Sequence, residues 1–165
     1  MAEILLFHRA LRLTAGVRVL AVRLRAAGHV VHLPDLYEGR SFTRLKDGVG
    51  HAEAIGFRQI IERGERAAEG LPAGLVYAGM LLGVMPAQAL PQTRPCAESA
   101  LLLHSSVPLA EFGGKWPAGV ARLLNGIIAA GGTTAFREPF DAAGITTTFI
   151  RPKGCLLSQT EFSSQ

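Results

Sequence analysis

Residues 75–88, Leu-Val-Tyr-Ala-Gly-Met-Leu-Leu-Gly-Val-Met-Pro-Ala-Gln, decide how the rest of the chain is interpreted. The first four, Leu75–Ala78, form a short apolar run that predicts a buried strand. Gly79–Gly83 predict a tight turn, because glycine tolerates the backbone angles and close approaches that such turns need. A helix is expected from Val84 onward. This stretch therefore predicts a strand, a turn and a helix in direct succession.

The turn carries two glycines separated by three residues, Gly79 and Gly83. This spacing is the frame of a nucleophile elbow, Gly-x-Ser-x-Gly, whose middle residue is raised above the sheet. The middle residue here is Leu81, which has no nucleophilic atom and no ionisable proton. Strained or left-handed backbone costs a non-glycine residue roughly 1–3 kcal/mol. Since no chemistry requires that strain, we expect Leu81 either to relax to ordinary φ and ψ or to bury its side chain.

The residues before this stretch alternate between apolar runs and helical patterns. Glu3–Phe7 and Val30–Leu33 predict buried strands of a parallel sheet. Between them, Val17–Ala27 repeats its apolar residues at helical spacing. A longer helix is expected from about Asp47 to Glu69, and its internal glycines, each costing about 1 kcal/mol relative to alanine, allow for a break.

The alternation continues after the central stretch. A helix is expected from Val84 to about Thr93, a strand over Ala100–His104 and an apolar segment at Val120–Leu124. The whole pattern predicts one α/β domain, residues 1–165, with a doubly wound, mainly parallel sheet flanked by helices. Ligands of such sheets bind beyond the carboxyl ends of the strands. Four residues follow predicted strands at that end: His8, Asp35, Leu81 and His104.

The character of the chain changes after residue 125, so that residues 126–165 form a divergent tail. This tail offers one candidate helix, Thr133–Ala143, and one short strand, Thr146–Ile150, which Pro152 would end. No amphipathic closing helix is evident in Leu156–Gln165. We expect poor order from about Pro152, and self-association through apolar surface left open.

Composition narrows the function classes. A hydrophobic content of 48% argues against disorder, and no apolar run approaches the roughly 20 residues that span a bilayer. The first residues do not form a secretory signal, so a soluble, cytoplasmic protein is expected. The net charge of +4 comes with arginines near the N terminus. Because no aromatic residues are interleaved with them to stack bases, nucleic acid is not an expected partner. The two cysteines, Cys96 and Cys155, match no metal-binding spacing.

Taken together, these landmarks resemble the dienelactone hydrolase family of α/β-hydrolases over residues 1–125. His8–Leu11 looks like the oxyanion loop of that family, Pro34–Tyr37 matches a signature that follows the next strand, and Gly79–Gly83 falls at the nucleophile elbow. The resemblance implies an α/β-hydrolase-like fold, incomplete at the C terminus. It also implies hydrolysis of a small ester or lactone by a Cys or Ser nucleophile with Asp and His partners, and no metal or organic cofactor.

The resemblance assigns positions residue by residue. Leu81 occupies the nucleophile position, where it is inert. The backbone N–H groups of Leu82 and Ala10 would form the oxyanion hole, since main-chain donors survive changes of side chain. Arg9 stands where well-studied members of the family have a glutamate.

The acid and the base of the triad are also missing at their expected places. The triad Asp is expected near Ala130, where no carboxylate stands, and the triad His should follow it in chain order. The histidine nearest the C terminus is His104. A substitute set is conceivable, with Ser106 on the same face as His104 and Asp35 orienting the histidine. The alternative is that the serine and the histidine make only local hydrogen bonds.

These observations predict a degenerate or truncated dienelactone hydrolase-like protein whose own ester or lactone hydrolysis is impaired. Two alternatives stay open. The first alternative is a non-catalytic small-molecule-binding protein that keeps a pocket above the sheet. Its pocket candidates are His8, Arg9, Asp35, His104 and Ser106. The second alternative is a damaged gene product.

Overall fold

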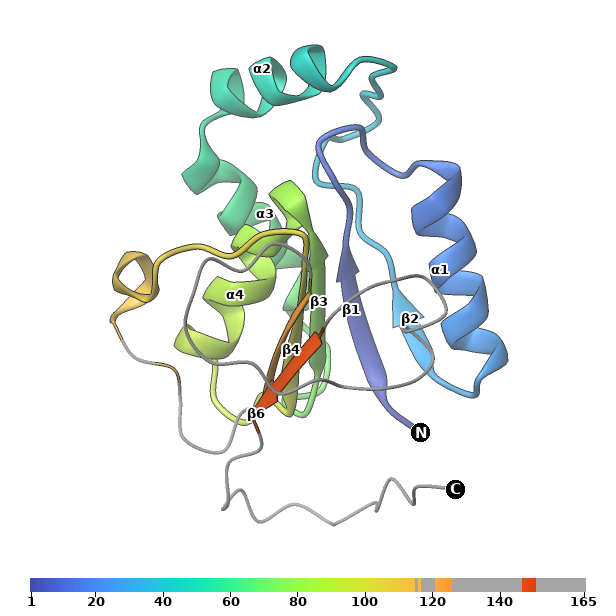
Figure 1. Ribbon diagram of the computed structural model, residues 1–165, viewed down its shortest axis with the longest axis vertical. Helices are drawn as coiled ribbons and strands as arrows, with labels where there is room; N and C mark the ends of the chain where they lie inside the picture. The colour runs from blue at the N-terminus through green and yellow to red at the C-terminus, as the bar shows by residue number, and fades with distance from the viewer. Residues whose placement is uncertain (115, 117–120, 126–146, 151–165) are drawn as a thin grey trace.

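The computed structural model describes residues 1–114, 116, 121–125 and 147–150 of the chain. Within these ranges the strands lie in one sheet in the order β2-β1-β3-β4-β5-β6 (Figure 1). The elements are β1 (Glu3–Phe7), α1 (Ala15–Ala26), β2 (Val30–His32), α2 (Leu45–Ile55), α3 (Phe57–Ala68), β3 (Val76–Met80), α4 (Val84–Thr93), β4 (Ser99–Leu103), β5 (Ala121–Asn125) and β6 (Thr147–Ile150), with short 3-10 turns at Leu81–Gly83 (η1) and Leu109–Phe112 (η2).

The strand order explains where a ligand would sit. From β1 the chain crosses to β2 at the edge of the sheet, and it then returns to β3 on the other side of β1. β2, β1, β3, β4 and β5 pair in parallel, whereas β6 is antiparallel to β5. The direction of winding therefore reverses between β1 and β3, and the carboxyl ends of these two strands form the switch point at which such sheets bind ligands. The predicted α/β class with a mainly parallel sheet is confirmed.

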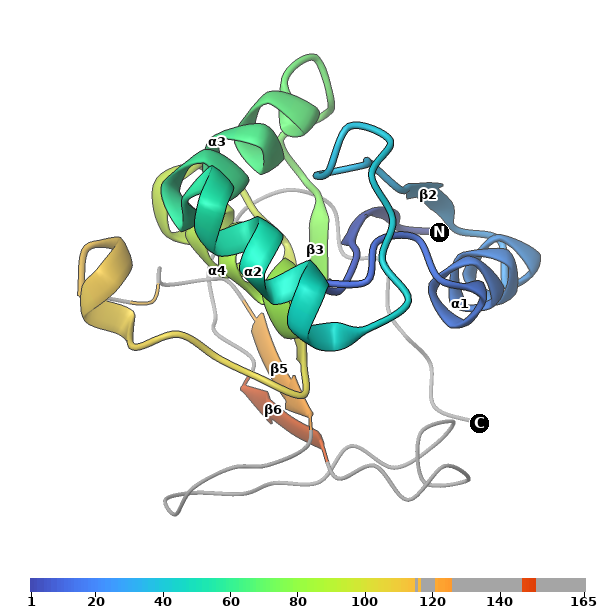
Figure 2. The same ribbon diagram turned by 90° about the horizontal axis from the view of Figure 1, so that it is seen from above.

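The alternation of side chains along each strand divides the core into two clusters. On one face Leu5 and Phe7 of β1 pack with Tyr77 of β3 against α3 and α4. On the other face Ile4 and Leu6 pack with residues of α1. Figure 2 shows α1 on one side of the sheet and α3 and α4 on the other. Successive strand residues point to opposite faces, so each buried strand needs apolar residues throughout, as its sequence has.

The single helix predicted for Asp47–Glu69 is two helices. Gly56 separates α2 from α3 with a φ of 91°, which a side chain would make costly, and the chain changes direction there. As a result α3 lies along the sheet while α2 crosses above the carboxyl ends of the strands (Figure 1). A Cβ on Gly48 of α2 would collide with the backbone carbonyl of Ala10, so the two backbones are in direct contact.

Several boundaries differ from those predicted. β3 extends to Met80, because Gly79 and Met80 still pair with Leu102 and Leu103 of β4. β4 ends at Leu103, since His104 turns into the left-handed region with a φ of 63°.

The strand predicted at Thr146–Ile150 is present as β6, and α4 has the bounds that were expected. The candidate helix Thr133–Ala143 and the end beyond Arg151 lie outside the described residues. Within the described part of the chain, no helix is both long enough and apolar enough to cross a membrane.

Two helical glycines provide a matched test of the packing between α3 and α4. A Cβ at Gly64 would collide with the ring of Pro86 and lie 3.3 Å from the ring of Phe7, whereas one at Gly50 would meet nothing within 4 Å. We predict that Gly64→Ala lowers the free energy of unfolding by about 1–3 kcal/mol. Gly50→Ala should raise it by roughly 0.5–1 kcal/mol, because alanine is the better helix former. Chemical denaturation measures both, and equal effects at the two positions would contradict the packing described.

Candidate functional site

The elbow lies at the end of β3, where the chain passes through η1 into α4. Leu81 has a φ of 50°, in the left-handed region that non-glycine residues seldom adopt. Its neighbour Met80 is still extended, with φ −117° and ψ 125°. The chain therefore turns sharply at Leu81, as it does in the elbow of an α/β-hydrolase.

Of the two outcomes expected for Leu81, relaxation of the backbone is wrong, and burial of the side chain is met only in part. Its backbone stays left-handed, and its side chain is only half-buried. The reason lies in the glycines on either side. A Cβ on Gly83 would lie 2.6 Å from the carbonyl oxygens of both Phe7 and His8, and one on Gly79 would collide with the carbonyl of Gly83. Because β1, β3 and α4 approach so closely, the turn between the two glycines has little room to change.

The two proposed oxyanion donors belong to neighbouring segments. Ala10 follows β1 and Leu82 follows β3, and these strands are paired in the sheet. The loop after β1 is a tight turn in which the N–H of Arg12 donates to the carbonyl of Arg9 at 2.9 Å. Ala10 is buried in this turn, and Leu82 packs partly against the core. The segments that carry Ala10 and Leu82 are thus adjacent at the carboxyl ends of β1 and β3, next to Leu81.

His8 ties the loop after β1 to the loop after β2. Its ring is buried, its Nδ1 lies 2.7 Å from the carbonyl oxygen of Arg9, and its Nε2 accepts a hydrogen bond from the N–H of Leu36 at 2.9 Å. Nε2 also lies 3.6 Å from Oδ1 of Asp35. Burial lowers the pKa of His8, although the carbonyl of Arg9 and the charge of Asp35 oppose this effect. An imidazole that donates from Nδ1 and accepts at Nε2 is neutral.

Asp35 is occupied by structural partners. It accepts hydrogen bonds from the guanidinium of Arg12 at 2.7 and 2.8 Å and from the N–H groups of Tyr37 and Gly39 at 3.0 and 2.8 Å. Partial burial would raise its pKa, but the bonds from Arg12, Tyr37 and Gly39 outweigh burial and lower the pKa. The carboxylate is therefore held ionised in a turn that fixes the loop after β2.

The substitute triad is not assembled. Asp35 follows β2 and His104 follows β4, and β1 and β3 lie between them in the sheet. Three strand spacings amount to about 14 Å, so Asp35 cannot orient His104. His104 and Ser106 are both exposed, and within the described ranges they share no hydrogen bond. The structure therefore does not bring Asp35, His104 and Ser106 together as a substitute set.

Arg9 lies in the turn after β1, where it is half-buried. Its Nε is shielded from solvent and has no hydrogen-bond partner among the residues that the structure describes. Arg9 thus places a cation, rather than a carboxylate, beside the switch point.

Gln88 was missed by the sequence analysis. It is fully buried in α4, where its Nε2 donates to the carbonyl of Val107 at 2.6 Å and its Oε1 accepts from the N–H of Val107 at 2.9 Å. A single side chain thus satisfies both backbone groups of one residue in the loop after β4. The available signal was a glutamine within Val84–Pro91, the part of the helix that is otherwise apolar.

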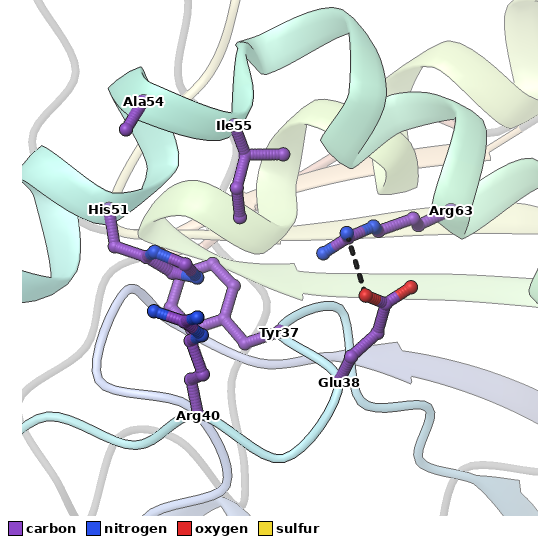
Figure 3. A pocket seen from close by; sticks show the side chains of 7 residues that line it. All are labelled: Tyr37, Glu38, Arg40, His51, Ala54, Ile55 and Arg63. Atoms are coloured by element: carbon purple, nitrogen blue, oxygen red, sulfur yellow. Dashed lines mark hydrogen bonds and ion pairs between the residues drawn. The ribbon is translucent and has the colours of Figure 1, made fainter.

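Among the residues that the structure describes, two of the pockets were not predicted from the sequence. One, of about 360 Å³, lies between the loop after β2 and helices α2 and α3 (Figure 3). The other, of about 590 Å³, lies between α3, α4 and the segment around η2. Among the described residues, neither pocket is lined by Leu81, Leu82 or Ala10. The first is lined by Tyr37, Glu38, Arg40, His51, Ala54, Ile55 and Arg63.

The part of the chain that the structure describes contains no group of three or more His, Cys, Asp or Glu side chains that could hold a metal ion. The polar atoms near the switch point instead bind one another or the backbone, as His8 and Asp35 do.

No protein-family model and no curated protein matches this chain. Among solved structures, a chain titled "m3DLH" is similar to it, with a TM-score of 0.53 and 17% sequence identity. The match covers 72% of the present chain and 55% of that chain, so the present chain spans about half of the length of that structure. At this identity the likeness shows the fold alone.

The buried, neutral His8 predicts a dependence of stability on pH. Its folded-state pKa lies below the usual 6.5, so the unfolded chain binds more protons as the pH falls through that value. We predict that the free energy of unfolding falls between about pH 7.5 and about pH 5.5, by at most about 1.4 kcal/mol per pH unit for this group. His8→Gln should flatten the slope, because an amide can make both contacts without titrating.

His51 contributes with the same sign, since its pKa is also lowered. The comparison is therefore made in a His51→Gln background, by denaturant titration at several pH values. An identical slope with and without His8 in that background would contradict the assignment.

Proposed function

We propose that this chain is a dienelactone hydrolase-like protein, with an α/β-hydrolase-like fold, in which hydrolysis of carboxylic esters or lactones is impaired. The observation that carries the proposal is the left-handed backbone of Leu81, held between Gly79 and Gly83 at the switch point of a parallel sheet. An elbow of this kind raises its middle residue to the place where a nucleophile acts. Here that place is taken by an aliphatic side chain.

The chemistry of the neighbouring residues explains why activity is expected to be low. A nucleophile of this type needs a base that removes its proton. His8 is the first residue of the loop compared with the oxyanion loop, but both of its ring nitrogens are engaged by Arg9 and Leu36. Asp35 is saturated by Arg12 and backbone N–H groups. The N–H groups of Leu82 and Ala10 remain as donors to a carbonyl oxygen, and donors alone do not replace the attacking atom.

A second candidate function, a non-catalytic small-molecule-binding protein, is favoured by a different observation. The pocket between the loop after β2 and α2 and α3 has a volume of about 360 Å³, within the range of small-molecule sites. Binding there would require no nucleophile.

Hydrolysis of p-nitrophenyl acetate tests the main proposal. All variants are made in a background in which both cysteines of the chain are replaced, Cys96→Ser with Cys155→Ser, because a free thiol reacts with activated esters. The parent should hydrolyse the ester no faster than an unrelated protein does. Leu81→Ser should restore little, because a serine without a base stays protonated. Leu81→Cys should give slight activity, since a cysteine is a few per cent thiolate at neutral pH.

Met80→Cys is the matched control for Leu81→Cys, because Met80 is the neighbouring residue but is still extended at the end of β3, whereas Leu81 is left-handed. Saturable turnover by the parent that Ser106→Ala or His104→Ala abolishes would overturn the proposal. Equal rates for the cysteines at positions 80 and 81 would show that the elbow gives no advantage.

A further inference from the structure

The pocket in Figure 3 is separate from the elbow and is built by three elements. The loop after β2 contributes Tyr37, Glu38 and Arg40, and α2 contributes His51 and Ile55. Arg63 reaches in from α3. Of the polar groups, Arg63 is held by the fold, whereas the side chains of Glu38 and Arg40 are exposed.

The charges around this pocket are unbalanced in favour of cations. Arg63 and Glu38 form an ion pair, with Nη2 and Oε2 2.9 Å apart. Within the described ranges Arg40 makes no ion pair, so one positive charge remains without a counter-charge. Desolvation, followed by the positive charges of Arg40 and Arg63, lowers the pKa of His51. Both guanidinium groups therefore act on the same small volume.

Arg63 is fixed in place and retains an unused donor. Its Nη1 donates to the carbonyl of Leu36 at 2.7 Å, and its side chain is only 17% exposed. Its Nε is shielded from solvent and has no hydrogen-bond partner among the described residues. A buried N–H without an acceptor costs roughly 1–3 kcal/mol. Arg63 therefore lines the pocket with a guanidinium whose hydrogen-bonding capacity the described residues do not fully use.

The wall of the pocket is aromatic and rigid. The ring centroids of Tyr37 and His51 lie 4.9 Å apart, and Phe42 packs 5.0 Å from His51 and 5.8 Å from Tyr37. Burial raises the pKa of Tyr37 to about 12, and its hydroxyl donates to the carbonyl of Gly48 at 2.8 Å. Ile55 adds an aliphatic surface on the α2 side (Figure 3).

We propose that this pocket binds a small organic oxyanion, a carboxylate or a phosphate monoester, with its charged oxygens against Arg40 and Arg63 and its apolar body against His51 and Ile55. Planar guanidinium groups match the geometry of both headgroups. The volume of about 360 Å³ limits the ligand to a small molecule. This site does not depend on the proposed hydrolase ancestry, since it shares no residue with the elbow.

Titration calorimetry on the full chain at physiological ionic strength tests the proposal. The probes are benzoate and phenyl phosphate, with benzamide as the neutral analogue. At least one anion should bind saturably and at least tenfold more tightly than benzamide, and the preferred anion identifies the headgroup. Arg40→Gln should weaken that binding about tenfold, which corresponds to about 1.4 kcal/mol. Arg44→Gln, an exposed arginine at the start of α2 outside the pocket, should leave it unchanged.

Arg40 is the variant of choice because it is exposed and makes no ion pair that holds the fold together. Arg63→Lys serves as the second variant, because it keeps the charge but loses the planar fork, and it should weaken binding as well. If the NMR signals of the His51 ring shift as the ligand is added and stop shifting at saturation, the ligand binds in this pocket. The proposal is overturned if neither anion binds saturably, if benzamide binds equally well, or if Arg44→Gln has the same effect as Arg40→Gln.

Discussion

The close approach of three backbone segments at the switch point is the constraint on which the structure depends. Gly83, at the start of α4, lies against the carbonyl groups of Phe7 and His8, and Gly79 lies against Gly83 itself. No residue with a Cβ fits at either position without displacing backbone. This packing brings α4 down onto the junction of β1 and β3, and it fixes the turn between the two glycines. The strained conformation of Leu81 is a consequence of that packing, whatever side chain stands there.

The loops around this junction are held by polar contacts that occupy the side chains of His8 and Asp35. His8 joins the turn after β1 to the loop after β2, and Asp35 closes that second loop with Arg12. In an enzyme of this architecture we would expect some of these groups to be free for a substrate. Here they hold the carboxyl edge of the sheet together, and the open polar pocket lies beyond the loop after β2, under α2. The polar contacts that hold the loops and the pocket proposed to bind a ligand are thus at two neighbouring places.

The sequence was sufficient to predict the individual strands and helices, but it did not predict which of them are in contact. Apolar runs predicted β1 and β3, and helical periodicity predicted α4, because burial and spacing are local properties. The order of strands is not local, which is why Asp35 was paired with His104 although two strands separate them. The backbone of Leu81 does not relax for the same reason. The turn that contains it is held by the contact of Gly83 with the carbonyl groups of Phe7 and His8, which lie far away in the sequence. The pocket of Figure 3 is lined by a loop and two helices that are separate in the sequence. The spacing of His51 and Ile55, four residues apart, places them on one face of a helix, but it does not predict the pocket.

The central claim is that packing imposes left-handed backbone on residue 81. The most direct measurement compares the unfolding free energies of Leu81→Gly and Leu81→Ala, which both remove the leucine side chain. At an ordinary position glycine is the less stable of the two by roughly 0.5–1 kcal/mol. A left-handed position reverses the order, because a Cβ there costs roughly 1–2 kcal/mol. The account predicts that Leu81→Gly is the more stable variant. A more stable Leu81→Ala would contradict it.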